Sequence, residues 1–132
     1  MGPNKEVIDR AKEIAKQTGA EITATSDPIE AVNDAGVIYT DIFVSMGEEH
    51  MKDKFAAFEG FQVNEELVSN ANDNYLFMHC LPAHRGEEVT DAVIDSKNSI
   101  VFDQAENRMW AQMSLLTYMC NPIAWNAYRD LY

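Results

Sequence analysis

Hydrophobic positions along the chain follow two alternating periods. Apolar residues recur at helical spacing from Val7 to Ala15, between Asn4, which can cap a helix, and Gly19, which can end one. Unbroken runs of β-favouring residues follow at 37–40 and 75–78, a pattern typical of strands buried on both faces of a sheet. The whole pattern predicts strands at 21–26, 37–40, 75–78 and 99–102, and helices at 5–18, 28–35, 48–58, 65–71, 91–94, 105–119 and 123–132.

Strands and helices alternate throughout, and this order predicts an α/β fold. Chains of this kind build a largely parallel sheet with helices on both faces, and we expect about four strands here. The expected architecture is a Rossmann-like three-layer sandwich. A length of 132 residues suits one domain with a core of its own.

Polar side chains follow three of the expected strands. Asp41 follows the strand at 37–40, His79 and Cys80 end the next one, and Asp103 follows the last. The carboxyl ends of parallel strands form the binding edge of such sheets, so these residues are candidates for a common site.

Each candidate also has a structural interpretation. Asp41 and Ser45 could hold an ammonium group, or they could cap a turn and the helix that follows. Cys80 beside His79 could be an activated thiolate, although neighbouring strand residues point to opposite faces. A buried cysteine can also act simply as a small apolar residue.

The sequence also leaves open a possible metal site and a possible anion-binding site. A zinc site made of His79, Cys80 and His84 is a weak possibility, because no second ligand pair with typical spacing accompanies it. Arg108 lies near the start of a long helix and could bind an anion together with the helix N-terminus. Alternatively, Gln104 and Arg108 form an i,i+4 pair on the helix surface.

The net charge of the chain disfavours two classes of binding partner. The chain carries 22 acidic and 10 basic side chains, and its net charge of −12 argues against binding to nucleic-acid phosphates or to an anionic membrane surface. No apolar run approaches the ~20 residues of a transmembrane helix, and the first residues lack the features of a secretory signal. Two cysteines do not make a disulfide framework. We therefore expect a cytoplasmic protein that binds neither nucleic acid nor membrane.

Three segments carry a specific resemblance. They read YTDIFVSMG at 39–47, FMHCLPAHRGEEVTD at 77–91 and VFDQAENR at 101–108. These segments strongly resemble ornithine carbamoyltransferases, within the aspartate/ornithine carbamoyltransferase family, and they occur in the family's order. The similarity extends from about residue 3 to residue 119.

The resemblance implies a reaction and an architecture. Family members transfer the carbamoyl group of carbamoyl phosphate to the δ-amino group of L-ornithine, giving L-citrulline and phosphate, with no metal or organic cofactor. Their two α/β domains enclose an active site that a neighbouring subunit of a trimer completes. Residues 1–120 resemble the second, ornithine-binding domain, truncated on its N-terminal side, and 121–132 form an unmatched helical tail.

The resemblance also implies roles for the matching residues. Asp41 would hold the α-amino group of ornithine, and Cys80 would lie near the δ-amino group as its proton acceptor. The backbone at Leu81 would contact the reacting group. The candidate site residues are Asp41 and Cys80 for catalysis, Asp41, Ser45 and Met46 for ornithine, and Cys80, Leu81 and Arg108 for carbamoyl phosphate.

The chain also departs from the family. It contains no Ser-x-Arg-Thr-Arg phosphate-binding motif, so we expect the isolated chain to be inactive and to need the family's first domain or a homo-oligomer. The alternative is a non-catalytic amino-acid-binding or interaction module derived from that domain. A transferase for another amine, such as putrescine, is disfavoured because Ser-Met-Gly at 45–47 is the ornithine-type signature.

Overall fold

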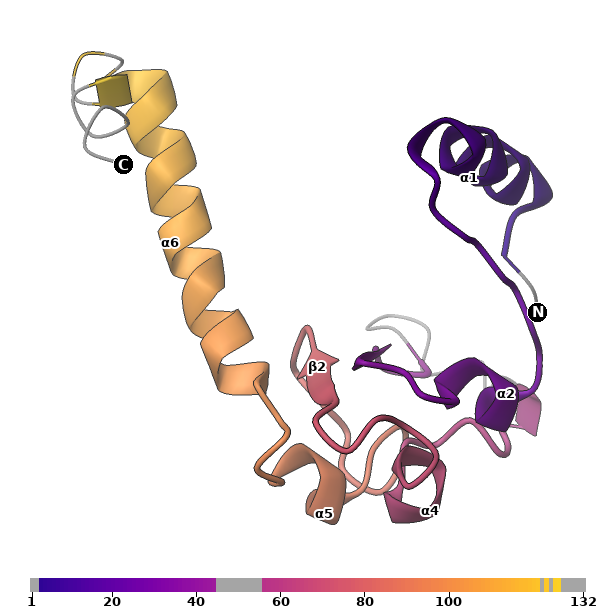
Figure 1. Cartoon of the computed structure of the whole chain (residues 1–132). Helices are drawn as coiled ribbons and strands as arrows, with labels where there is room; N and C mark the ends of the chain where they lie inside the picture. Colours follow the sequence, from indigo (N-terminus) through magenta and orange to yellow (C-terminus); the bar gives the residue numbers. More distant parts are fainter. Residues whose placement is uncertain (1–2, 45–55, 122, 124, 127–132) are drawn as a thin grey trace.

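The computed structural model describes residues 3–44, 56–121, 123 and 125–126 (Figure 1). Its elements, in chain order, are α1 (Lys5–Thr18), α2 (Pro28–Val32), β1 (Val37–Thr40), α4 (Glu65–Val68), β2 (Leu76–His79), α5 (Asp91–Ile94) and α6 (Val101–Cys120). This order confirms the α/β class. The helix expected at 48–58 lies outside the described residues except for its last turn, where Ala56 and Ala57 are helical. Most of the tail at 121–132 also lies outside them.

The two central strands pair in parallel. Val37 lies opposite Leu76 and Thr40 lies opposite His79, so the strands run in register along their whole length. This confirms the expected parallel pairing, with the second strand beginning one residue later than the sequence predicts. A parallel pair brings both carboxyl ends to the same edge of the sheet, and this sets the position of the candidate site.

Two expected strands are not formed. No strand is present at 21–26, and none of the described strands pairs with that segment, which lacks the neighbour that a strand needs for its hydrogen bonds. At 99–102, Ser99 makes a single parallel bridge with Phe77. The Ile100 carbonyl then accepts a hydrogen bond from the Gln104 N–H at 2.9 Å. Val101 and Phe102 therefore belong to the first turn of α6 and not to a strand.

Local sequence explains where three helices begin. Asn4, Asp27 and Asn64 each stand immediately before a helix, and each side-chain oxygen accepts a backbone N–H two or three residues further on. Gly19 ends α1 with a φ of 75°, a conformation that glycine adopts at low cost. Thr90 precedes α5 as expected, but it makes no capping hydrogen bond.

The core lies on one face of the two strands. Ile38 and Phe77 point into a cluster that α2, α4 and α5 complete with Val32, Leu67 and Val93. Phe77 is fully buried, and so are two polar side chains, His79 and Glu88. The core residues are Val32, Ile38, Val63, Leu67, Tyr75, Phe77, Val89, Val93, Ile94 and Val101.

The opposite face of the strands is open. Val37 is 53% exposed and Tyr39 is 55% exposed, so the expected burial of β1 on both faces is wrong. Alternate strand residues point to opposite faces, and the helices that contribute to the core cover only the face of Ile38 and Phe77. Across the described parts of the chain, the fold is therefore a small parallel sheet with one helical layer packed against it.

Two long helices extend away from this body. Figure 1 shows α1 and α6 as separate arms on either side of the strands, with α6 joined to the body at its first turn beside β2. Both helices expose apolar side chains, including Val7, Ile14, Trp110 and Leu116. Among the described helices, none combines the length and apolar character required to cross a bilayer.

Candidate functional site

Asp41 and Cys80 meet at the carboxyl edge of the sheet. Each directly follows one of the paired strands, and the parallel register places them side by side. The Cys80 thiol donates a hydrogen bond to Asp41 Oδ1 at 3.1 Å, and the Ile42 N–H donates to the same oxygen at 2.8 Å. Residues 39 positions apart in sequence thus form the centre of the candidate site.

The contact shifts the ionisation of both groups. Hydrogen bonds from the Cys80 thiol and then from the Ile42 N–H lower the pKa of Asp41 below its ordinary value. In return, the hydrogen bond to Asp41, followed by desolvation, raises the pKa of Cys80. Asp41 is therefore an anion and Cys80 a neutral, exposed thiol at neutral pH. Neither an activated thiolate nor a buried apolar cysteine describes Cys80 in the free chain.

His79 faces away from Cys80. Its side chain is fully buried, whereas Cys80 is exposed, as expected for neighbours at the end of a strand. The Leu81 N–H donates to His79 Nδ1 at 2.8 Å, so a neutral His79 carries its hydrogen on Nε2. That nitrogen lies 3.3 Å from Glu88 Oε1, although the contact falls outside hydrogen-bond geometry. The His79 and Glu88 side chains therefore contact each other in the core, on the side of the strand opposite to the Cys80 thiol.

Gln104 connects three elements at this edge. Its Oε1 accepts the His79 backbone N–H at 3.1 Å, and its Nε2 donates to Tyr39 Oη at 3.0 Å. The side chain therefore joins α6 to both strands. An i,i+4 surface pair with Arg108 is not formed.

The other predicted site residues are less closely gathered. Leu81 follows Cys80 with a φ of 54°, and no donor among the described residues reaches its carbonyl. Arg108 is exposed on α6, four residues and about 6 Å of helix rise beyond Gln104. Ser45 and Met46 lie outside the described residues. The structure thus brings Asp41 and Cys80 into contact, with Leu81 next to Cys80 in the chain, and it leaves Arg108 exposed on α6.

A cleft of about 400 Å³ borders Asp41. Its walls are mainly apolar, and they include Phe43 and Phe58, whose rings stack with centroids 4.7 Å apart. Asp41 supplies a carboxylate at this cleft, so a ligand with an ammonium group and an alkyl chain would find a partner for each part.

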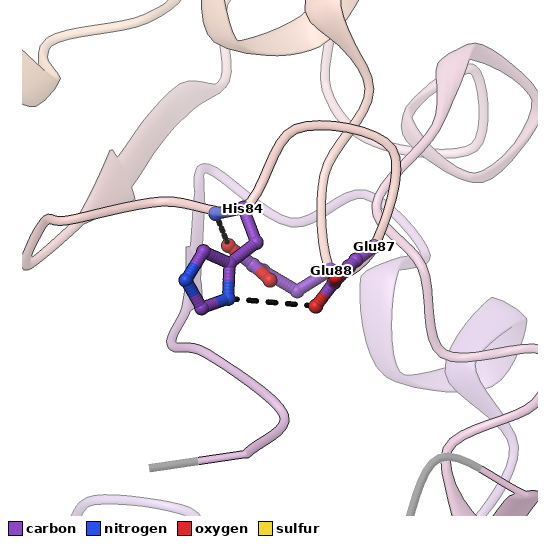
Figure 2. A group of neighbouring side chains, drawn as sticks. All are labelled: His84, Glu87 and Glu88. Carbon is purple, nitrogen blue, oxygen red and sulfur yellow. Dashed lines mark hydrogen bonds and ion pairs between the residues drawn. The ribbon is translucent and has the colours of Figure 1, made fainter. Parts of the chain in front are cut away.

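The zinc site considered from sequence is not assembled. Among the described residues, the grouping of potential metal ligands is His84, Glu87 and Glu88, without His79 or Cys80 (Figure 2). The three lie on the loop between β2 and α5.

Sequence reasoning missed two residues that shape this region and gave a third another role. Glu88 is fully buried beside His79, and Gln62 donates to the carbonyls of Gly86 and Glu87 at 2.8 and 2.9 Å. Gln104 is expected at this edge as a possible partner of Arg108, and it bridges the two strands to α6 instead. Glu88 lies within a motif that the sequence does single out. Its position directly before an apolar residue, Val89, is only a weak indication of burial, because glutamate side chains are ordinarily exposed to solvent.

The chain matches a described protein family over most of its length. Residues 1–119 match the family described as "Aspartate/ornithine carbamoyltransferase, Asp/Orn binding domain". The chain is 58% identical over 115 residues to the catabolic ornithine carbamoyltransferase of Thermoplasma acidophilum, and 54% identical over 114 residues to the ornithine carbamoyltransferase of Bacillus thuringiensis. Each alignment takes in 86% of this chain but only 38% and 36%, respectively, of those proteins.

Solved structures agree with these sequence matches. The ornithine carbamoyltransferase of Pyrococcus furiosus superposes with a TM-score of 0.80 at 52% identity, over 87% of this chain and 37% of that one. The anabolic ornithine carbamoyltransferase of Campylobacter jejuni gives a TM-score of 0.82 at 37% identity, over 92% and 42%. The chain thus spans well under half the length of the relatives that it resembles.

Proposed function

The chain belongs to the aspartate/ornithine carbamoyltransferase family through its Asp/Orn-binding domain, and we propose from this that it forms the ornithine-binding part of an ornithine carbamoyltransferase. The proposed reaction transfers the carbamoyl group of carbamoyl phosphate to L-ornithine, giving L-citrulline and phosphate. The contact between Asp41 and Cys80 is the observation that carries the proposal, because it joins two family motifs at the carboxyl edge of the sheet.

Asp41 is the proposed anchor for ornithine. Its Oδ1 is occupied by Cys80 and Ile42, while no described donor reaches Oδ2, so one oxygen is available to the α-ammonium group. The alkyl chain of ornithine would lie along the apolar wall of the adjoining cleft. Ser45 and Met46 are proposed to line the same pocket, on the basis of the family motif alone.

Cys80 is the proposed acceptor of the proton that the δ-amino group must lose. In the free chain the hydrogen bond to Asp41, together with desolvation and the Asp41 charge, raises the pKa of Cys80 and keeps it a neutral thiol. An ammonium group bound at Asp41 would offset that charge and favour the thiolate. Substrate binding would thereby prepare the base that its own reaction requires.

The chemical step is then a nucleophilic substitution at the carbamoyl carbon. The deprotonated δ-nitrogen attacks that carbon, the new C–N bond forms, and the C–O bond to phosphate breaks, so that inorganic phosphate leaves. The attacking nitrogen loses its second proton to the departing phosphate. The backbone at Leu81 is proposed to position the reacting groups. Arg108 is proposed to offer positive charge to the carbamoyl phosphate, which accumulates negative charge in the transition state.

A second polypeptide segment is proposed to complete the site and the fold. Arg108 alone is a poor match for a dianionic phosphate on a chain of net charge −12. The open face of β1 and the apolar side chains of α6 offer a surface for that segment, whether another domain or another copy. Packing there would add the second helical layer of a three-layer sandwich. The cytoplasm is the proposed location, since both cysteines are free thiols.

The test is reconstitution of citrulline synthesis. The chain is assayed alone and after mixing with the separately produced N-terminal part of the Thermoplasma acidophilum relative. Activity is expected only in the mixture. Asp41→Asn should abolish it, whereas Asp73→Asn, a matched change in an exposed turn, should leave it intact.

Calorimetry with L-ornithine separates the proposal from its alternative. An amino-acid-binding module without catalysis would bind ornithine through Asp41 but yield no citrulline in any mixture. Absence of both ornithine binding and citrulline would refute both functions.

A further inference from the structure

We propose that His84, Glu87 and Glu88 form a binding site for a divalent transition-metal ion, with Zn²⁺ as the ion of best fit. One imidazole nitrogen and two carboxylate oxygens lie within 4.8 Å of one another on a single loop. Figure 2 shows the three side chains converging, with the Glu88 carboxylate lying between the His84 backbone and the two other side chains. This site is separate from Asp41 and Cys80, and it does not depend on the proposed enzymatic function.

The buried carboxylate of Glu88 has one oxygen that a bound cation could satisfy. Glu88 is fully buried, and its Oε1 accepts the His84 backbone N–H. Its Oε2 is also buried and has no hydrogen-bond partner among the described residues. An unpaired buried carboxylate oxygen is costly, and a bound cation would satisfy it.

The spacing of two of the ligand atoms suits a tetrahedral ion. His84 Nδ1 lies 3.4 Å from Glu87 Oε2. Zinc–nitrogen and zinc–oxygen distances of about 2.0–2.1 Å at a tetrahedral angle place neighbouring ligand atoms about 3.3–3.4 Å apart. A small rotation of the Glu88 carboxylate would complete a three-ligand set, with water as the fourth ligand.

The backbone around the three ligands is already fixed. Gln62 donates to the carbonyls of Gly86 and Glu87, and the Val63 N–H donates to the Glu88 carbonyl at 2.8 Å. Arg85 binds Asp95 through both of its terminal nitrogens, at 2.6 and 2.9 Å. These contacts hold the loop in place, so little conformational entropy remains to be lost on metal binding.

The donor set favours one class of ion. An imidazole with two carboxylates suits zinc, copper or nickel, whereas calcium requires six to eight oxygens. The two carboxylates balance the charge of a divalent cation, and the net charge of −12 attracts it. His84 and Glu87 are partly exposed, with 49% and 41% of their side chains accessible, so an ion can reach the buried Glu88 between them.

The test is calorimetric titration of the intact chain with zinc sulfate, above the ordinary imidazole pKa of about 6.5. We expect one bound ion per chain. His84→Ala and Glu87→Gln should each weaken binding by about tenfold or more. The matched controls are Glu66→Gln, an exposed carboxylate outside the loop, and Cys80→Ser, which removes the nearby thiol; both should bind zinc as the parent does.

A second measurement needs no variant that could misfold. Cobalt(II) bound to the unmodified chain should show ligand-field bands without the thiolate-to-metal charge-transfer band that cysteine would give. The His84 ring resonances should shift on zinc addition. Absence of binding, unchanged affinity in His84→Ala, or loss of affinity in Cys80→Ser would each overturn the proposal.

Discussion

Replacing Gln104 with alanine removes the side chain that joins α6 to both strands. Gln104 accepts the His79 backbone N–H at 3.1 Å and donates to Tyr39 Oη at 3.0 Å. Alanine keeps the helix intact but offers neither hydrogen bond. We expect a clear loss of stability, because the same substitution on a free surface of α6 would be neutral or slightly favourable.

The size of the loss follows from the two contacts. Each hydrogen bond contributes about 1 kcal/mol net, and the His79 N–H would be left unpaired in a partly buried position. The higher helix propensity of alanine returns a few tenths of a kcal/mol. The free energy of unfolding should therefore fall by about 2 kcal/mol for Gln104→Ala. Tyr39→Phe should cost less, about 0.5–1 kcal/mol, since Tyr39 is 55% exposed.

Urea denaturation followed by far-ultraviolet circular dichroism measures both values. With a slope of about 2 kcal/mol per molar urea, the midpoint for Gln104→Ala should fall by about 1 M. Gln104→Glu is the matched control, because its carboxylate still accepts the His79 N–H and can accept the Tyr39 hydroxyl hydrogen. The double variant with Tyr39→Phe should show a coupling of about 0.5–1 kcal/mol.

Two outcomes would refute this reasoning. Unfolding of Gln104→Ala at the parental midpoint would mean that the bridge does not stabilise the chain. Strict additivity of Gln104→Ala and Tyr39→Phe would mean that the two side chains do not interact.

Three further predictions follow from the same structure. Asp41→Asn replaces the carboxylate whose hydrogen bond and charge raise the pKa of Cys80, so Cys80 should react faster with iodoacetamide at mildly alkaline pH, as measured by peptide mass mapping; an unchanged rate would count against the pair. Asn64→Ala removes the cap of α4 and should lower the free energy of unfolding by about 1 kcal/mol, whereas Asn64→Asp should restore it. Arg85 lowers the pKa of Asp95, so the stability from this pair should be present above pH 3.8, the ordinary value, and be lost as the pH falls below it. Arg85→Met should therefore unfold more easily than the parent near neutral pH and equally in acid, and a difference that persists in acid would contradict the assignment.

Much of the local structure, and the family, could be predicted from the sequence. Asn4, Asp27 and Asn64 cap their helices as predicted, because a cap depends only on a side chain and a backbone N–H two or three residues away. The strand at 37–40 was predicted with its full length, and the parallel pairing followed from the alternation of elements. Three motifs in the family's order identified the ornithine carbamoyltransferase resemblance without any coordinates.

Sequence patterns could not determine which surfaces are covered. The segments at 21–26 and 99–102 have sequence patterns typical of strands. The first has no neighbouring strand, and the second forms the first turn of α6. Val37 and Tyr39 belong to an unbroken apolar run, yet both are more than half exposed. A strand forms and is buried only where another segment supplies hydrogen bonds and apolar contact, and those partners lie far away in sequence.

The chemistry of the site likewise depended on tertiary contacts. His79 and Cys80 are neighbours in sequence, but the strand sends the first into the core and the second to Asp41. From the sequence, Glu88 is expected to be an exposed charge, whereas the conformation of the β2–α5 loop buries it beside His79. The pKa of Cys80 depends on Asp41, which lies far away in sequence, and the burial of the unpaired Glu88 oxygen depends on the residues packed around it. Only folding brings these residues together.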